Sequence, residues 1–186
     1  MDKVSSTRKK IIDMVYISLF AVLIAVCSWI SIPTLVPFTL QTFGVFCAAG
    51  LLGGKRGTMS VIVYLLLGAV GLPVFASFKG GIASLLGVTG GYIVGFVFTA
   101  AAYWIITGLF GKSTLTMIIG MLSGLVLCYA FGTAWFMYAY AKSTGSIGVA
   151  SALSMCVFPF IIPDIIKIVL AAVISKIIPK HVKIFD

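Results

Sequence analysis

The stretch IIDMVYISLFAVLIAVCSWISI (residues 11–32) decides the class of fold, because its 22 consecutive positions hold only one charged side chain, Asp13. A helix needs about 20 predominantly apolar residues to cross the hydrocarbon core of a bilayer. The apolar core of a secretory signal peptide is only about 7–15 residues long and is followed by an A-x-A-like cleavage site. This run is longer, and no such site follows it. We therefore interpret it as a retained transmembrane helix.

The composition of the whole chain agrees with this interpretation. Of its 186 residues, 61% are hydrophobic and 9% are charged, and the mean hydropathy is +1.23. Soluble domains are about 45–50% apolar and about 25% charged. So little polar material cannot cover so much apolar surface in water, and the aliphatic and aromatic content is too high for disorder. The composition predicts an integral membrane protein.

Further apolar runs, separated by clusters of Gly, Pro and Lys, predict five more spans. Six spans use about 120–140 residues, so we expect one all-α transmembrane domain over residues 1–186, without an appended soluble domain. The second and third spans are short, which predicts that they are tilted or pack mainly against other helices. The expected spans are 11–32, 39–54, 57–72, 89–110, 114–140 and 157–178.

Basic residues follow the predicted topology. The chain has 13 Lys and Arg against 4 acidic residues, a net charge of +9. Cytoplasmic loops of membrane proteins collect Lys and Arg. We expect both termini in the cytoplasm and no nucleic-acid partner, because this orientation places ten of the bases on the cytoplasmic side: Lys3, Arg8, Lys9, Lys10, Lys55, Arg56, Lys112, Lys176, Lys180 and Lys183.

Residues 71–92, GLPVFASFKGGIASLLGVTGGY, are apolar and rich in glycine but do not read as one helix. Non-helical backbone at membrane depth is tolerated where it is buried in protein or lines a cavity. Two interpretations remain: a re-entrant lid over a bound molecule, or an ordinary loop. The apolar side chains of the segment, among them Phe75 and Phe78, favour the lid.

Asp164 and Lys167 are an acid and a base placed together inside the last predicted span. A charged side chain at the bilayer centre costs about 2.5–3.5 kcal/mol even on insertion scales, so each must face the interior and find a partner. At a spacing of i, i+3 they share one helix face. The pair is therefore either an ion pair that holds the bundle together or the polar floor of an outward pocket. Pro159 and Pro163 place the start of the helix nearby, which favours the pocket.

The stretch TGGY (89–92) opens the fourth predicted span. Thr89 is a natural N-cap, and the backbone N–H groups of Thr89, Gly90 and Gly91 suit a carbonyl or carboxylate. The glycines are explained equally well by close helix packing.

Thr39, Gln41 and Thr42 begin the second predicted span. They are either helix caps or donors and acceptors of a pocket. Ala21 and Ala25 form an A-x-x-x-A pattern in the first span, a spacing that lets another helix approach closely. From the residues alone, internal packing explains this pattern best.

Groups needed for catalysis are missing from the sequence. GLFGKS (108–113) resembles a phosphate-binding loop, but that motif requires glycine at position 106, where the chain has Ile106. The single histidine, His181, and four dispersed cysteines form no metal-binding or nucleophile pattern. We therefore expect no enzyme, no metal and no cofactor.

Three segments together resemble one family. LLGGKRGTMSVIVYLLLGAVGLPVFASFKGGIASLLGVTGGYIVGF (51–96), FPFIIPDIIK (158–167) with its Pro-Asp-x-x-Lys pattern, and VPFTLQTF (36–43) are similar to the BioY family. These proteins are the substrate-binding S components of energy-coupling-factor (ECF) biotin transporters. The resemblance extends over about 130 residues, from Val36 to Lys167.

The resemblance implies a multi-pass protein of the bacterial cell membrane with six helices and a pocket near the extracellular face. It implies three protein partners, a transmembrane coupling protein and two ATP-binding-cassette ATPases, and an S component that topples in the bilayer to carry its pocket inward. Ala21 and Ala25 match the family's Ala-x-x-x-Ala motif, which meets the coupling protein. The resemblance therefore favours partner docking over internal packing for these two residues.

The residues fit biotin as the ligand. Its ureido ring offers two N–H donors and one carbonyl, which Asp164 as acceptor and Lys167 as donor would complete. Its apolar body needs apolar walls and its carboxylate needs a donor near the mouth of the pocket. The expected walls are Phe75, Tyr92 and Trp135, and the expected carboxylate partners are Lys79 or the Thr89–Gly91 amides.

The resemblance thus implies a high-affinity biotin-binding subunit that imports biotin with its ATPase partners. The alternative is a self-sufficient small secondary transporter or channel for a small organic solute. It ranks second because the sequence has no evident inverted repeat and no chain of proton-relay residues.

Overall fold

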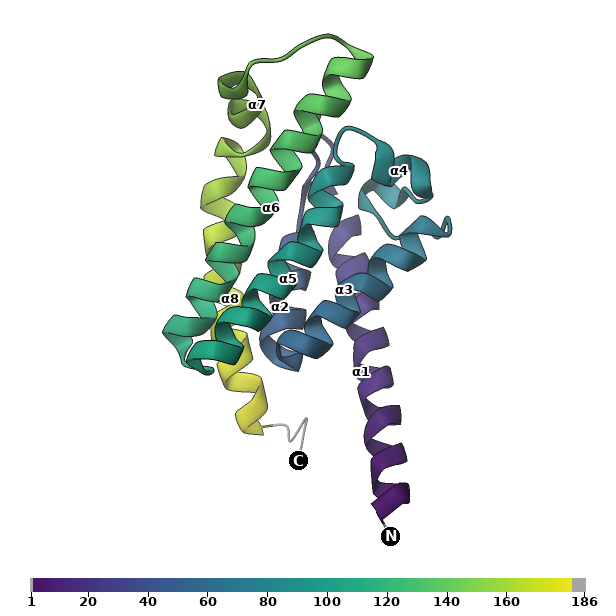
Figure 1. The fold of residues 1–186 in the computed structure, drawn as a ribbon, viewed down its shortest axis with the longest axis vertical. Coiled ribbons are helices and arrows are strands. Elements are labelled where there is room, and N and C mark those ends of the chain that lie inside the picture. The colour runs from purple at the N-terminus through teal and green to yellow at the C-terminus, as the bar shows by residue number, and fades with distance from the viewer. Residues whose placement is uncertain (1, 182–186) are drawn as a thin grey trace.

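The computed structural model of the chain describes residues 2–181 and is a bundle of helices with short irregular segments at one end (Figure 1). The helices that run most of its length are α1 (Asp2–Trp29), α5 (Gly90–Phe110), α6 (Thr114–Ser143) and α8 (Phe158–His181). In Figure 1 the start of α1 and the end of α8 lie at the same, lower end of the bundle.

The outside of the bundle is apolar. Leu109 and Val126 are 72% and 64% exposed, whereas Asp164 and Lys167 are buried. This distribution is the inverse of that in a soluble protein. It fits a surface that faces lipid.

Three helical stretches within residues 2–181 are long and apolar enough to cross a membrane: Thr7–Trp29 of α1, α5 and α6. A fourth is the pair formed by α7 (Val149–Cys156) and α8, which is bent by 43° at the break between them. α8 begins at Phe158, so Pro159 lies in its first turn, as the sequence predicts.

The expected spans 39–54 and 57–72 correspond to α2 (Gln41–Leu52) and α3 (Gly54–Ala69), of 12 and 16 residues. At 1.5 Å per residue they are about 18 Å and 24 Å long, less than the roughly 30 Å of a hydrocarbon core. Eight of the twelve residues of α2 are buried, so α2 packs mainly against other helices. The turn between them is tight: Gly53 has φ of +81°, and a Cβ on Gly57 would lie 2.6 Å from the Cα of Ala49.

Helices α5 and α6 pack closely against each other because glycines lie at their contacts. A Cβ on Gly124 would lie 2.5 Å from the carbonyl oxygen of Thr99, and one on Gly95 would lie 2.8 Å from the Sγ of Cys128. Small residues at such contacts let helix backbones approach. The contact places Tyr129 of α6 next to the interior of the bundle.

A short antiparallel hairpin, which the sequence did not predict, joins α1 to α2. β1 (Ser31–Ile32) pairs with β2 (Phe38–Thr39) in the register Ser31↔Thr39 and Ile32↔Phe38. Its second strand leads directly into α2 and fixes Thr39 at the start of that helix.

The segment of residues 71–92, called the lid below, is folded into short helical turns rather than being irregular throughout. It contains a 3-10 turn η1 (Ala76–Phe78) and the short helix α4 (Ile82–Leu86). Phe75 is 1% exposed, and its ring packs edge-on against that of Tyr64 with centroids 5.5 Å apart. Phe78, in contrast, is 63% exposed and stacks on Trp29 at 5.2 Å. Burial of the apolar lid residues therefore holds for Phe75 but not for Phe78.

Candidate substrate-binding site

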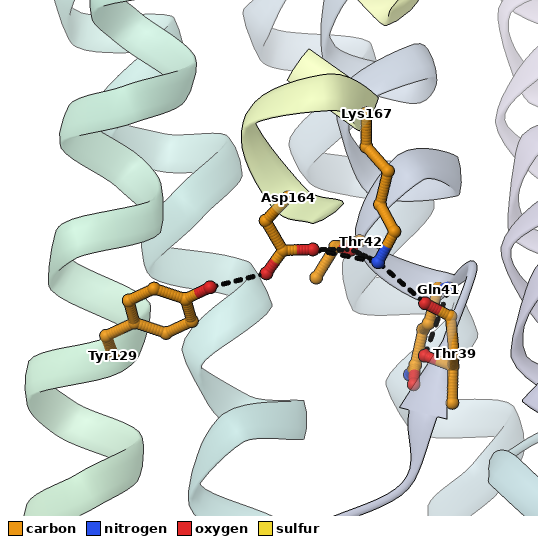
Figure 2. A network of polar contacts seen from close by, with 6 residues as sticks. All are labelled: Thr39, Gln41, Thr42, Tyr129, Asp164 and Lys167. Carbon is orange, nitrogen blue, oxygen red and sulfur yellow. Dashed lines mark hydrogen bonds and ion pairs between the residues drawn. The ribbon is translucent and has the colours of Figure 1, made fainter. Parts of the chain in front are cut away.

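A buried network of polar side chains lies where α8, α6 and the β2–α2 segment meet (Figure 2). Its centre is the pair on α8, in which the Nζ of Lys167 lies 2.8 Å from the Oδ1 of Asp164. Their side chains are only 7% and 3% exposed. The i, i+3 spacing thus brings the two groups together on one face of the helix, as the sequence predicts.

Asp164 accepts hydrogen bonds on both of its oxygens. The Oδ1 atom accepts from Lys167 and from the hydroxyl of Thr42 at 2.8 Å, and the Oδ2 atom accepts from the hydroxyl of Tyr129 at 2.6 Å. A carboxylate has about four acceptor positions. Among the described residues three of these are used, which leaves one acceptor position on Oδ2.

Lys167 uses all three of its N–H donors within the protein. They go to the carbonyl oxygen of Thr39 at 2.8 Å, the hydroxyl of Thr42 at 3.0 Å and Asp164. The ammonium also lies 4.9 Å from the centre of the Phe38 ring, a cation–π distance. Lys167 therefore neutralises Asp164 and ties β2 and α2 to α8, and no N–H is left over for a ligand.

Gln41 connects this network to the lid. Its side-chain amide donates to the hydroxyl of Tyr64 at 2.7 Å, and that hydroxyl donates to the carbonyl oxygen of Val74 at 3.1 Å. The carbonyl oxygen of the Gln41 side chain accepts no hydrogen bond from residues 2–181 and remains available at the cavity wall. The hydroxyl of Thr39 accepts from the Gln41 backbone N–H at 3.1 Å, so its own hydrogen is free to donate.

The network forms the polar end of a narrow inner cavity of about 80 Å³. An outer cavity of about 300 Å³ lies next to it, beneath the lid. The two share the wall residues Pro37, Ala76, Thr89 and Ile93. The site is thus a two-part pocket whose polar floor is buried and whose outer part is walled largely by lid residues.

Most of the expected binding residues line this pocket. Thr39, Gln41, Tyr92, Asp164 and Lys167 line the inner cavity. The outer cavity is lined by Phe75 and Lys79, and Thr89 lines both.

Three of the expected binding residues line neither cavity. Trp135 lines neither cavity, and its ring N–H donates to the carbonyl oxygen of Gly87 at 3.0 Å. A Cβ on Gly91 would lie 2.3 Å from the Cβ of Trp135, and one on Gly90 would lie 1.8 Å from the carbonyl oxygen of Leu85. Trp135, Gly90 and Gly91 therefore pack α6 and α4 against the start of α5, and the wall role of Trp135 stays a prediction.

The start of α5 offers fewer free amides than expected. Thr89 occupies the N-cap position, but its side chain forms no capping hydrogen bond. The N–H of Gly90 donates to the carbonyl oxygen of Gly87 at 3.0 Å, and that of Tyr92 donates to the carbonyl oxygen of Thr89 at 3.1 Å. Of the three expected amides, that of Gly90 is therefore already used, and Lys79, which lines the outer cavity, stays an expected partner for an anionic group.

Ala21 and Ala25 are buried inside the chain's own bundle, at 0% and 5% exposure. Here α1 packs so closely on α2 that a Cβ on Gly44 would lie 3.1 Å from the Cα of Ile24. Neither alanine presents a surface to another protein, so their expected docking role is corrected to internal packing. The neighbouring Val22, 54% exposed, lies on the outward face of α1.

Two residues of the site lacked a clear signal in the sequence. Tyr129 lies 35 residues before Asp164 in an ordinary apolar run, and the packing of α6 against α8 brings it to the carboxylate. Thr42 had been expected as either a cap or a pocket group, and it bonds to both members of the ion pair. Among the described residues, no group of three or more His, Cys, Asp or Glu is placed to hold a metal ion.

A family model described as the BioY family matches residues 1–184. The chain belongs to the BioY family. It is 41% identical over 167 residues to the biotin transporter BioY of Thermotoga maritima, covering 88% of this chain and 93% of that protein. It is also 38% identical over 161 residues to the probable biotin transporter BioY of Pyrococcus horikoshii, covering 86% and 91%.

A solved structure agrees in fold. The chain is similar to the 2.1 Å crystal structure of the S-component for biotin from an ECF-type ABC transporter, with a TM-score of 0.82 and 29% identity. The match covers 94% of both chains. The family resemblance seen in the sequence is thereby confirmed, and with it a multi-pass membrane protein of a transporter family rather than an enzyme class.

Proposed function

We propose that this chain is the biotin-binding S component of an ECF-type transporter in the bacterial cell membrane. In this proposal it imports biotin when assembled with a transmembrane coupling protein and two ABC ATPases. The observation that carries the proposal is the buried Asp164 carboxylate, which keeps one open acceptor position at the floor of the pocket. The relatives, named as biotin transporters, supply the identity of the ligand.

The ureido ring of biotin complements the polar floor. One ring N–H donates to the free position on the Oδ2 of Asp164, and the other donates to the side-chain carbonyl of Gln41. The ring carbonyl accepts from the hydroxyl of Thr39. Lys167 acts as a positioning group, because its N–H donors already hold Asp164, Thr42 and Thr39 in place.

The rest of the ligand fits the remainder of the pocket. The sulfur-containing ring packs against the apolar walls of the inner cavity, among them Tyr92 and Phe96. The valerate chain extends past Thr89 into the outer cavity, where Lys79 pairs with its carboxylate. Because the inner cavity is only about 80 Å³, the lid segment moves to admit the ligand. No cofactor or metal takes part in this scheme.

The proposed topology is a single domain of six transmembrane helices formed by α1, α2, α3, α5, α6 and α8. Both termini are cytoplasmic, since the start of α1 and the end of α8 lie at one end of the bundle (Figure 1), and the sequence assigns ten of the thirteen basic residues to the cytoplasmic side. The pocket then opens near the extracellular face. The outward apolar face of α1, with Ser18 and Val22, is the proposed contact with the coupling protein.

Biotin binding to the purified chain, without partners, tests the proposal. We expect Asp164→Asn to weaken binding roughly 10- to 150-fold, because a hydrogen bond to a charged group is worth about 1.5–3 kcal/mol. Lys176→Met, an exposed lysine on the same helix, is the matched control and should leave affinity unchanged. No binding by the unaltered chain would refute the proposal. Full biotin uptake by the chain alone, without the ATPases, would instead favour a self-sufficient transporter.

A further inference from the structure

A separate cavity of about 490 Å³ lies away from the biotin pocket, between α1, the α2–α3 turn and the end of α5. It shares no wall residue with the inner or outer part of that pocket. Four charged residues line it: Asp13, Lys55, Arg56 and Lys112. Their formal charges sum to +2, so the cavity has a net positive wall.

The acid in this cavity is already paired. Asp13 lies 2.8 Å from Arg56, with both side chains about one-third exposed. Within residues 2–181, neither Lys55 nor Lys112 lies within salt-bridge distance of a carboxylate. The ammonium of Lys112 reaches across to the α2–α3 turn, since a Cβ on Gly53 would lie 3.2 Å from its Nζ. Lys55 and Lys112, which come from different turns, thus line the same cavity without an acidic partner.

The remaining walls are apolar. Ile17, Leu52, Met59 and Trp104 line the same cavity. Trp104 is 45% exposed, and tryptophan is enriched at the boundary between membrane and water. A basic rim above apolar walls suits an amphiphile with a negative head and hydrocarbon tails.

We propose that this cavity binds the phosphodiester headgroup of an anionic phospholipid from the cytoplasmic leaflet. Lys55 and Lys112 contact the phosphate, Arg56 stays paired with Asp13 at the rim, and an acyl chain lies along the apolar walls. Basic pockets between transmembrane helices at the cytoplasmic side are a recurrent site for such headgroups. The leaflet assignment rests on the proposed orientation of the chain.

The test uses the full chain purified in detergent, with lipid retention measured by native mass spectrometry. The probes are phosphatidylglycerol, the neutral-headgroup lipid phosphatidylcholine, and inorganic phosphate as a competitor. Each lysine near an anionic group contributes about fivefold in affinity, so Lys55→Gln with Lys112→Gln should weaken phosphatidylglycerol binding roughly thirtyfold. Lys142→Gln is the matched control, because Lys142 lies over the Tyr138 ring at the end of α6.

We expect phosphatidylglycerol to bind more tightly than phosphatidylcholine, with millimolar phosphate failing to displace it. Equal binding of the two lipids, or unchanged phosphatidylglycerol binding in the double variant, would overturn the proposal. Displacement by phosphate would identify a soluble phosphate compound instead, and loss of coupling-protein assembly with unchanged lipid binding would identify an acidic protein surface. Biotin binding by the double variant is measured in parallel. Its retention shows that the chain is folded and keeps this test independent of the proposed function.

Discussion

Replacing Lys167 by Met removes the one positive charge that contacts the buried Asp164. The ammonium donates three hydrogen bonds of 2.8–3.0 Å in a position where both side chains are less than a tenth exposed. Breaking a buried pair by removing one partner costs about 3–5 kcal/mol, because the other charge stays buried without compensation. We expect Lys167→Met to lower the free energy of unfolding by that amount.

The double variant Asp164→Asn/Lys167→Met separates stability from ligand recognition. Removing both charges of a buried pair is often nearly neutral, so this variant should unfold within about 1–2 kcal/mol of the unaltered chain. Its biotin affinity should nevertheless stay roughly 10- to 150-fold weaker, because the charged acceptor for the ligand N–H is gone. The measurements are denaturant titration in detergent micelles and isothermal titration with biotin.

Lys176→Met again serves as the control for the lysine substitution, since Lys176 is exposed on the same helix. Two results would refute the reasoning. If the double variant is as unstable as Lys167→Met alone, the unpaired charge of Asp164 is not the cause of the lost stability. If the double variant binds biotin as tightly as the unaltered chain, Asp164 is not the acceptor for the ligand.

Three further substitutions probe the lid, the outward face of α1 and the outer cavity. Gly68→Ala should lower the thermal unfolding midpoint and increase protease cleavage of the lid, because its Cβ would lie 2.0 Å from the Phe75 ring. Such overpacking costs about 1–3 kcal/mol. Unchanged cleavage would show that the Phe75 ring does not hold the lid in place. Ala21→Trp should destabilise the isolated chain, because Ala21 is buried. Val22→Trp, at a 54% exposed position, should leave stability unchanged but weaken assembly with the coupling protein. Intact assembly of the Val22→Trp variant would exclude the outward face of α1 as the contact. Lys79→Gln should weaken biotin about two- to fivefold and leave biotin methyl ester unaffected; equal losses for both ligands would exclude a carboxylate contact.

Much of the helical architecture follows from local sequence signals. The apolar runs place both ends of α5 and α6, and the end of α1, within three residues of their observed bounds, and Pro159 marks the start of α8. The start of α1 was missed, because its polar first turns at Asp2 precede the apolar run. The β1–β2 hairpin and α7 were not predicted, because two-residue strands and an eight-residue helix show too little periodicity.

The floor of the site was predictable only where its partners lie close in sequence. Asp164 and Lys167 are three residues apart, and helix geometry alone brings them together. Tyr129 reaches the same carboxylate through tertiary packing that leaves no local pattern. The placement of Ala21 was wrong for a related reason, since an A-x-x-x-A spacing shows that a helix approaches closely but not which helix it is.

The ion pair at the floor also has an electrical consequence. Moving one elementary charge through a potential of 100 mV changes the free energy by about 2.3 kcal/mol. Asp164 and Lys167 carry opposite charges whose atoms lie 2.8 Å apart, so they travel as a neutral unit in any reorientation of the protein in the bilayer. Membrane voltage therefore neither drives nor opposes the movement of this floor. In the pocket region the field acts on Lys79 while the pocket is empty, and in the proposed complex the carboxylate of biotin neutralises that charge as well.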